Sequence, residues 1–411
     1  MTVSPSSPAA PYGGAAEQPG SPAASPWGVV EQPGGVAEHL GLDAGVPDAS
    51  DPLAASGARP PGPGPRSTLL AAGMLATSLL LAGLVVLPAP YAVEMPGPTT
   101  DVLGTQDGTP LITISGAPTF PTTGQLRLTT VSATGTPDYP SSVANVVRGW
   151  LSPDDVVVPT EQIVPTGQTQ QQIDELNSQE MTSSQENATV AALTALGYTV
   201  PATLTVAQTI DGTDAAAKLK DGDVLSSIDG KPLPDYQTLI DTLAAVKPGA
   251  TITLGITRAG APLDVPIVTG TRTDGEGALI GVFVKPTFDF PVNVKIQIDG
   301  VGGPSAGTMF ALGIYSELTP ADETNGQHIA GTGTMDVSGN VGAIGGIRQK
   351  MIGAARDGAT WFLAPQSNCD EVVGHVPAGL HVVKVATLKD AVAAMTAIGA
   401  GSGAGLPACG S

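Results

Sequence analysis

The feature that most constrains this chain is a run of nineteen residues, Leu69–Leu87, that contains no charged residue and no proline. A helix of that length measures about 28 Å, close to the ~30 Å hydrocarbon core of a bilayer. Arg59 and Arg66 precede the run, whereas the first basic residue after it is Arg127. Because basic residues stay on the cytoplasmic side, we expect a single transmembrane helix over 67–89, with a cytoplasmic N-terminus and everything after it outside the cytoplasm.

A cleaved signal peptide is the alternative for this run. Its apolar region usually has 7–15 residues near the N-terminus, whereas this run begins at residue 69. We therefore favour an uncleaved anchor in the cell membrane.

The segments at the two ends of the chain are predicted to be unfolded. Residues 1–66 contain 13 prolines and 11 glycines and no sustained apolar period, a composition typical of a disordered tail. The last residues, 399–411, are also rich in glycine and are expected to form a flexible tail.

The charge balance excludes one class of partner. The chain has 17 basic and 37 acidic residues, a formal net charge of −20. A nucleic-acid-binding surface must be basic to neutralise phosphates, so we expect no nucleic acid partner.

Only two cysteines occur, Cys369 and Cys409, and both follow the apolar run. In an oxidising compartment an even number of cysteines permits a disulfide. We favour a Cys369–Cys409 bridge that ties the C-terminal tail to the body of the protein, with two unpaired thiols as the alternative.

The folded part after the anchor contains both strands and helices, which indicates an α+β fold. Residues 90–104 look irregular, whereas the alternation of Leu126, Leu128 and Thr130 predicts a strand over Gly124–Thr134. Helices are predicted over Ile173–Leu196 and Leu388–Ile398.

Residues 196–270 have the pattern of a separate compact unit. We predict a strand over Asp223–Ile228, a helix that carries Leu239 and Leu243, and strands over 251–257 and Leu263–Val268. The order of LKDGDVLSSIDG, this helix and PGATITLGITRAG resembles the PDZ domains of bacterial proteases.

PDZ domains bind the C-terminus of a peptide as an added strand, with backbone N–H groups holding its carboxylate. The resemblance assigns the carboxylate-binding loop to LGYTV, which is Leu196, Gly197, Tyr198, Thr199 and Val200. A PDZ-like spacer with a closed groove is the alternative.

The chemistry concentrates between Asp299 and Lys350. Ser305 lies in GGPSAG, between a glycine-rich loop and a predicted helix, where free N–H groups can stabilise an oxyanion. The base of a Ser-His-Asp triad is poorly supported, because His328, His375 and His381 lack a motif and His39 lies in the tail. Lys350 has apolar neighbours that would lower its pKa, so it could serve as the base instead.

These segments resemble the proteolytic domain of Lon-type proteases, which use a Ser-Lys dyad. The GPSAG motif and the run TGTMDVSGNVGAIGGIRQK carry the resemblance. It implies that Ser305 is the nucleophile, that Lys350 is the base and that Thr332 orients the lysine. Gly302, Gly303, Pro304 and Ala306 would form the substrate and oxyanion loop.

The layout is similar to that of membrane-anchored, PDZ-containing Lon-like proteases of Gram-positive bacteria. It implies a Lon-like domain in two parts, 90–195 and 271–398, interrupted by a PDZ domain over 196–270. No G-x-x-x-x-G-K-[ST] phosphate loop occurs in the sequence, so we expect an ATP-independent serine endopeptidase with no cofactor and no metal.

Its expected substrates are unfolded or loosely structured extracytoplasmic proteins, with C-terminal tails bound by the PDZ domain. The resemblance also raises a homo-oligomeric ring as a form to test. Two other functions stay open at this point, a catalytically silent PDZ adaptor and a chaperone that binds peptides without turnover.

Overall fold

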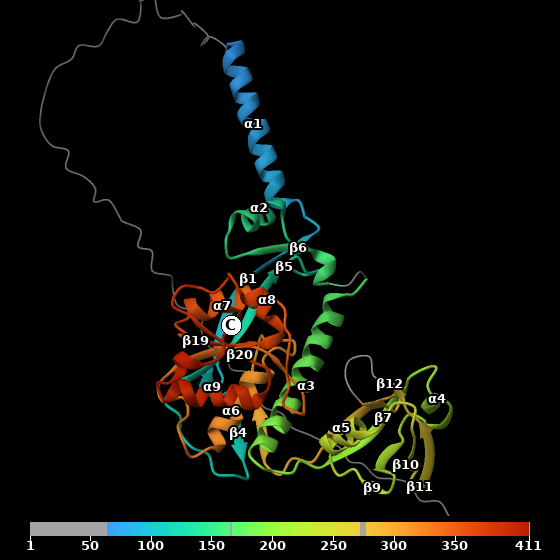
Figure 1. Cartoon of the computed structure of the whole chain (residues 1–411). Helices are drawn as coiled ribbons and strands as arrows, with labels where there is room; N and C mark the ends of the chain where they lie inside the picture. Colours follow the sequence, from blue (N-terminus) through green and yellow to red (C-terminus); the bar gives the residue numbers. More distant parts are fainter. Residues whose placement is uncertain (1–63, 165–166, 272–276, 411) are drawn as a thin grey trace, which may run out of the picture. The chain divides into compact units, whose positions relative to one another are not determined.

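The computed structural model of the protein describes residues 64–164, 167–271 and 277–410 (Figure 1). The disordered tail predicted over 1–66 therefore lies almost entirely outside the described residues. Helix α1 (Pro65–Val86) covers the apolar run, and none of its side chains is buried. Within the described ranges it is the one helix that is long and apolar enough to cross a membrane.

A six-stranded mixed sheet forms the centre of the larger folded part (Figure 1). Strands β20, β19, β16 and β5 run parallel to one another. Strand β1 is antiparallel to β5 on one side and to β6 on the other. In spatial order they are β20 (His381–Val385), β19 (Trp361–Pro365), β16 (His328–Gly331), β5 (Gln125–Thr134), β1 (Tyr91–Asp101) and β6 (Val156–Pro159). The strand predicted over Gly124–Thr134 is thus confirmed as β5.

Helices cover both faces of this sheet because its strands alternate two sets of apolar side chains. Ile329 and Leu363 belong to the cluster that includes α3 (Gln170–Ala195), α6 (Gly307–Leu318) and α9 (Leu388–Gly399). Ala330 and Phe362 belong to the cluster of α7 (Ile347–Arg356) and α8 (Cys369–Val372) on the other face. The helices predicted near 173–196 and 388–398 are α3 and α9.

The prediction of an irregular segment over 90–104 was wrong for its first part. Tyr91–Asp101 forms β1, which pairs with both β5 and β6. Pro96, Gly97 and Pro98 interrupt the alternation in the sequence, and the pairing register shifts between Pro96 and Thr99. A Cβ on Gly97 would lie 2.7 Å from the carbonyl oxygen of Thr130, so the glycine permits the close approach of the two strands.

A second sheet belongs to the compact unit predicted from the sequence, and two helices accompany it. Its spatial order is β11 (Ala261–Val268), β10 (Thr251–Arg258), β8 (Val224–Ile228), β7 (Ala202–Thr209) and β14 (Val282–Phe288), with β9 (Lys231–Pro232) beside β8. Its helices are α4 (Asp214–Lys218) and α5 (Tyr236–Ala245). The predicted elements β8, α5, β10 and β11 are confirmed, but a boundary at residue 270 leaves out β14.

The remaining elements are short and connect these parts. They are β2 (Thr105–Gln106), β3 (Thr109–Pro110), β4 (Ile112–Ser115), α2 (Val143–Leu151), η1 (Thr160–Gln162), β12 (Gly270–Thr271), β13 (Ala278–Leu279), β15 (Asn293–Ile296), β17 (Thr334–Met335), β18 (Val341–Gly342), η2 (Gln366–Asn368) and η3 (Gly403–Gly405).

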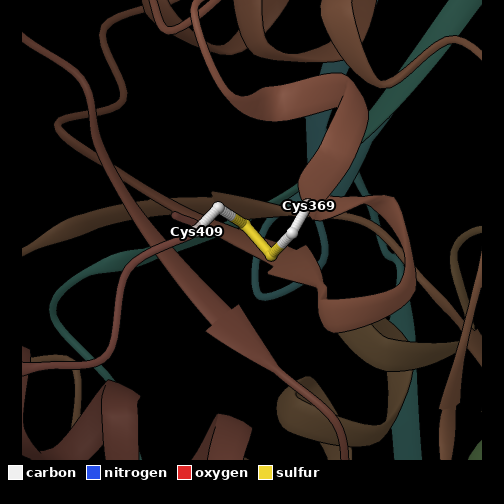
Figure 2. Close-up of a disulfide and its surroundings, with 2 residues drawn as sticks. All are labelled: Cys369 and Cys409. Atoms are coloured by element: carbon white, nitrogen blue, oxygen red, sulfur yellow. A yellow bond between two sulfur atoms is a disulfide. The ribbon is translucent and has the colours of Figure 1, made fainter. Parts of the chain in front are cut away.

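The C-terminal segment is packed against the domain, contrary to the flexible tail predicted for 399–411. Gly403 lies so close to Trp361 that a Cβ there would meet its ring at 2.6 Å. The backbone N–H of Lys384 donates to the carbonyl of Pro407. Figure 2 shows the disulfide that joins Cys369 and Cys409, with a sulfur–sulfur distance of 2.06 Å.

Candidate active site

Ser305 lies at the end of a loop that its neighbours hold in place from two sides. On one side, helix α3 contacts the loop, because the Asn177 carbonyl accepts from the N–H of Gly303 and the Ser184 hydroxyl donates to the Pro304 carbonyl. On the other side, the carbonyl of Ser305 itself accepts from the N–H of Gly333. Helix α6 begins at Gly307, immediately after this loop.

Lys350 reaches the same point from helix α7 on the other side of the sheet. Its side chain is 4% exposed, and its Nζ lies 2.8 Å from Ser305 Oγ. The helix can bury a lysine at this position because Ile347, Met351 and Ala354 on the same helix are fully buried. The two residues of the predicted dyad are 45 positions apart in the sequence and within hydrogen-bonding distance in the fold.

Thr332 completes a three-residue cluster. It is 0% exposed and lies directly after β16. Its hydroxyl donates to the carbonyl of Ser305 over 3.0 Å and accepts from Lys350 Nζ over 3.1 Å.

Two opposing effects set the protonation of Lys350. Burial disfavours the ammonium form and lowers the pKa of Lys350 to about 8, while the negative charge of Glu94 raises it. For Glu94 the larger effect is burial, which raises the pKa of its carboxyl, and the charge of Lys350 lowers it. A lysine with a pKa near 8 is partly neutral at neutral pH and can therefore accept a proton.

A cavity of about 750 Å³ opens on the cluster and is large enough for a segment of polypeptide. It is lined by the predicted loop residues Gly302, Gly303, Pro304 and Ala306 together with Ser305 and Lys350. The N–H of Gly303 is already bonded to Asn177, and Pro304 has no N–H. Among the described residues, the N–H groups of Gly302, Ser305 and Ala306 have no acceptor, so these are the candidates for an oxyanion site.

None of the described histidines lines this cavity. His328, His375 and His381 are exposed and do not line it, and His39 lies outside the described residues. Within the described ranges, no three His, Cys, Asp or Glu side chains are grouped so that they could hold a metal ion.

The structure does not support Leu196–Val200 as a carboxylate-binding loop. Three of its N–H groups close the C-terminal end of α3, since those of Leu196, Gly197 and Tyr198 donate to carbonyls of Ala192, Leu193 and Thr194. Gly197 has the positive φ of 85° that is typical of such a helix end. These N–H groups are therefore not available to a peptide carboxylate, and Val200 is buried.

The sequence did not predict the two carboxylates that line the cavity. Glu94 comes from β1 and Glu180 from the polar half of α3. Glu94 lies in the segment that was predicted to be irregular. Its position at the cavity could be predicted only by recognising that this segment is strand β1. Glu180 belongs to a polar stretch of helix that carries no motif of its own.

Two protein-family models match the chain. The Lon protease (S16) C-terminal proteolytic domain matches residues 297–397, which include Ser305, Thr332 and Lys350. The PDZ domain model matches residues 175–269, which end before β14.

Curated relatives show the same two parts. The Lon protease of Mycoplasma genitalium is 32% identical over 116 residues, which are 26% of this chain and 14% of that protein. The periplasmic pH-dependent serine endoprotease DegQ of Escherichia coli is 34% identical over 74 residues, 18% of this chain and 16% of that protein. The chain thus matches only a small share of each relative.

Among solved structures, the PDZ domain of an SdrC-like protein from Listeria monocytogenes is similar over 20% of this chain and 86% of that chain, with 23% identity and a TM-score of 0.19. The two family models, and not this structural likeness, show that the chain carries the proteolytic domain of Lon-type serine peptidases together with a PDZ domain.

Proposed function

We propose that this protein is an ATP-independent, membrane-anchored serine endopeptidase that uses a Ser305–Lys350 dyad. The observation that carries the proposal is the 2.8 Å contact between Lys350 Nζ and Ser305 Oγ, made by a lysine that is 4% exposed. A structural lysine is normally solvated or ion-paired. No carboxylate of the described residues forms an ion pair with this one.

The reaction begins when neutral Lys350 takes the proton of Ser305 Oγ as that oxygen attacks a peptide carbonyl. The N–H groups of Ser305 and its neighbours stabilise the oxyanion, an effect typically worth about 3–4 kcal/mol per donor. Protonated Lys350 then gives its proton to the leaving amine, and an acyl group remains on Ser305. Lys350, neutral again, activates the water that hydrolyses this ester.

The test uses an unfolded substrate such as labelled casein and the purified full-length protein in detergent. Ser305→Ala and Lys350→Met are each expected to abolish cleavage while retaining the circular dichroism spectrum of the wild type. Cleavage by both variants at the wild-type rate contradicts the dyad. A wild type that binds casein without cutting it indicates the adaptor or chaperone function instead.

The apolar helix and the disulfide support an extracytoplasmic location for the reaction. Helix α1 is anchored in the cell membrane as a single pass, and basic residues precede it, which favours a cytoplasmic N-terminus. The Cys369–Cys409 bridge supports an oxidising, extracytoplasmic location for the catalytic part. Protease added to intact protoplasts is expected to digest this part, whereas protection of it contradicts the orientation.

The PDZ domain is proposed to bind C-terminal tails of substrates at β14. Strand β7 has partners on both sides, β8 and β14, whereas β14 ends the described sheet. Strand addition needs an open edge, and β14 offers one. Helix α5 lies near this edge, because its Leu243 and the Val282 and Val284 side chains of β14 pack on one apolar cluster.

The loop before β14 is the proposed carboxylate site. Within the described residues, the N–H groups of Ile280 and Gly281 have no acceptor, and Gly281 has a φ of 90°. The preceding Gly277 touches the end of α5, where a Cβ would lie 2.8 Å from Ala244 Cα. A peptide with an apolar free C-terminus is expected to bind and to protect 282–288 from hydrogen exchange. Equal binding of the C-terminally amidated peptide contradicts this site.

A further inference from the structure

A buried asparagine outside the dyad holds one wall of the catalytic cavity. Asn368 is 2% exposed and lies in the short helix η2 just before the disulfide residue Cys369. Its Oδ1 accepts from the N–H of Ile344 over 3.0 Å, and its Nδ2 donates to the carbonyl of Ile344 over 2.9 Å. The same Nδ2 donates to Glu371 over 2.9 Å. A single side chain thus bonds both backbone groups of Ile344, as a neighbouring strand would.

The segment that Asn368 holds is part of the cavity. Ala343, Ile344 and Gly345 line it together with Ser305 and Lys350. The segment leads through Gly346, whose carbonyl accepts from the N–H of Lys350, into helix α7. It therefore connects the cavity wall directly to the helix that carries the base.

The bonds to Asn368 occupy both backbone groups of Ile344 and leave those of its two neighbours uncommitted. The described residues offer no hydrogen-bond partner for the backbone of Ala343 or Gly345, both of which are exposed in the cavity lining.

We infer that Ala343–Gly345 binds the backbone of the substrate as an added strand, and that Asn368 is the positioning residue that keeps this strand open to the cavity. The inference rests on the proposed protease function and names the surface on which its polypeptide substrate lies. The recognised feature is an extended peptide backbone of any sequence, which suits a protease of unfolded segments. Asn368 itself touches no substrate.

The first experiment measures peptide binding without turnover. In a Ser305→Ala background, the dissociation constant of an uncleaved fluorescent decapeptide is compared with and without Asn368→Asp, which keeps the size of the side chain and removes the donor to Ile344. Asn325→Asp is the matched control, since Asn325 Nδ2 donates to the carbonyl of Gly399 elsewhere in the domain. We expect at least about tenfold weaker binding for Asn368→Asp, because its carboxylate can donate neither to the Ile344 carbonyl nor to Glu371, and no change for the control.

The second experiment separates positioning from general damage. With Ser305 intact, hydrolysis of p-nitrophenyl acetate, which lacks an extended backbone, is compared with cleavage of the decapeptide. Asn368→Asp and Asn368→Ala are expected to raise KM for the decapeptide about tenfold and to leave the ester rate within about twofold of the wild type. Equal losses on ester and peptide, or unchanged decapeptide binding, overturn the inference.

The two proposals fail in different ways. If the wild type cleaves neither substrate, the protease function fails, yet the Ser305→Ala binding measurement still decides whether Asn368 maintains a peptide-binding strand.

Discussion

The rate of peptide cleavage is predicted to rise with pH through an apparent pKa of about 8, the value that burial gives Lys350. Only neutral Lys350 can accept the proton of Ser305, so kcat/KM follows the neutral fraction of the free enzyme. An ordinary lysine has a pKa near 10.4 and is about 0.04% neutral at pH 7. With a pKa of about 8, the neutral fraction is about 9% at pH 7 and about 91% at pH 9.

These fractions predict a tenfold increase in kcat/KM between pH 7 and 9, followed by a plateau above about pH 9. The plateau is the distinguishing feature. A solvated lysine would let the rate continue to rise about tenfold per pH unit up to pH 10. The 4% exposure of Lys350 therefore has a kinetic consequence that can be measured.

The assay follows a fluorogenic peptide from pH 6.5 to 9.5, at substrate concentrations well below KM, with Ser305→Ala as the blank. Lys350→Arg is the matched variant, because arginine keeps the charge and the donors but does not lose its proton in proteins. It is expected to lose about 10²–10⁴ in kcat/KM at every pH, the usual contribution of a general base. A flat wild-type profile, a rate that still rises about tenfold per pH unit as pH 9.5 is approached, or an active Lys350→Arg enzyme refutes the reasoning.

Three further predictions follow from other groups. Glu94→Gln removes the charge that raises the pKa of Lys350, so the midpoint of the pH–rate profile should move to lower pH and activity at pH 7 should increase; a midpoint that moves upward contradicts this electrostatic role. The double variant Cys369→Ser/Cys409→Ser opens a loop of 40 residues and should lower the free energy of unfolding by about 4 kcal/mol, measured by urea denaturation, whereas an unchanged midpoint argues against a stabilising bridge. Burial raises the pKa of Glu317 from 4.5 to about 7, so between these two values the folded state binds more protons than the unfolded state and stability falls as pH increases. Glu317→Gln should lack this decline between pH 5 and 7.5, and an identical decline in both proteins assigns it to another group.

The parts of the fold that the sequence predicted well are those with a local pattern. Strands β5, β8, β10 and β11 alternate apolar and polar residues, and α5 repeats apolar residues at helical spacing. The motifs around Ser305 and Lys350 are contiguous, so they could be recognised before the fold was known. The 2.8 Å distance between Lys350 Nζ and Ser305 Oγ depends on the tertiary fold and could not be predicted from the motifs alone.

The parts that were missed depend on residues distant in the sequence. Strand β1 is interrupted by prolines, and its pairing with β5 and β6 overrides the weak local pattern. Strand β14 looks like the start of the next segment, yet it completes the sheet that contains β7. Gly197 was assigned to the carboxylate-binding loop, but its positive φ belongs to the end of helix α3. A glycine in a short loop indicates an unusual backbone conformation, but it does not indicate whether that conformation binds a ligand or ends a helix.

The hydrogen bonds of Thr332 explain how the lysine can be a base while it contacts two hydroxyl groups. The Thr332 proton is committed to the carbonyl of Ser305, so its oxygen can only accept from Lys350. A neutral amine has two N–H groups and one lone pair, and Thr332 takes one N–H. This interaction fixes the rotation of the amine, so that its lone pair can point at the hydroxyl proton of Ser305. The distance between Lys350 Nζ and Ser305 Oγ is 2.8 Å. Glu94 raises the pKa of Lys350 without an ion-pair contact among the described residues, and a paired carboxylate would hold the proton on the amine.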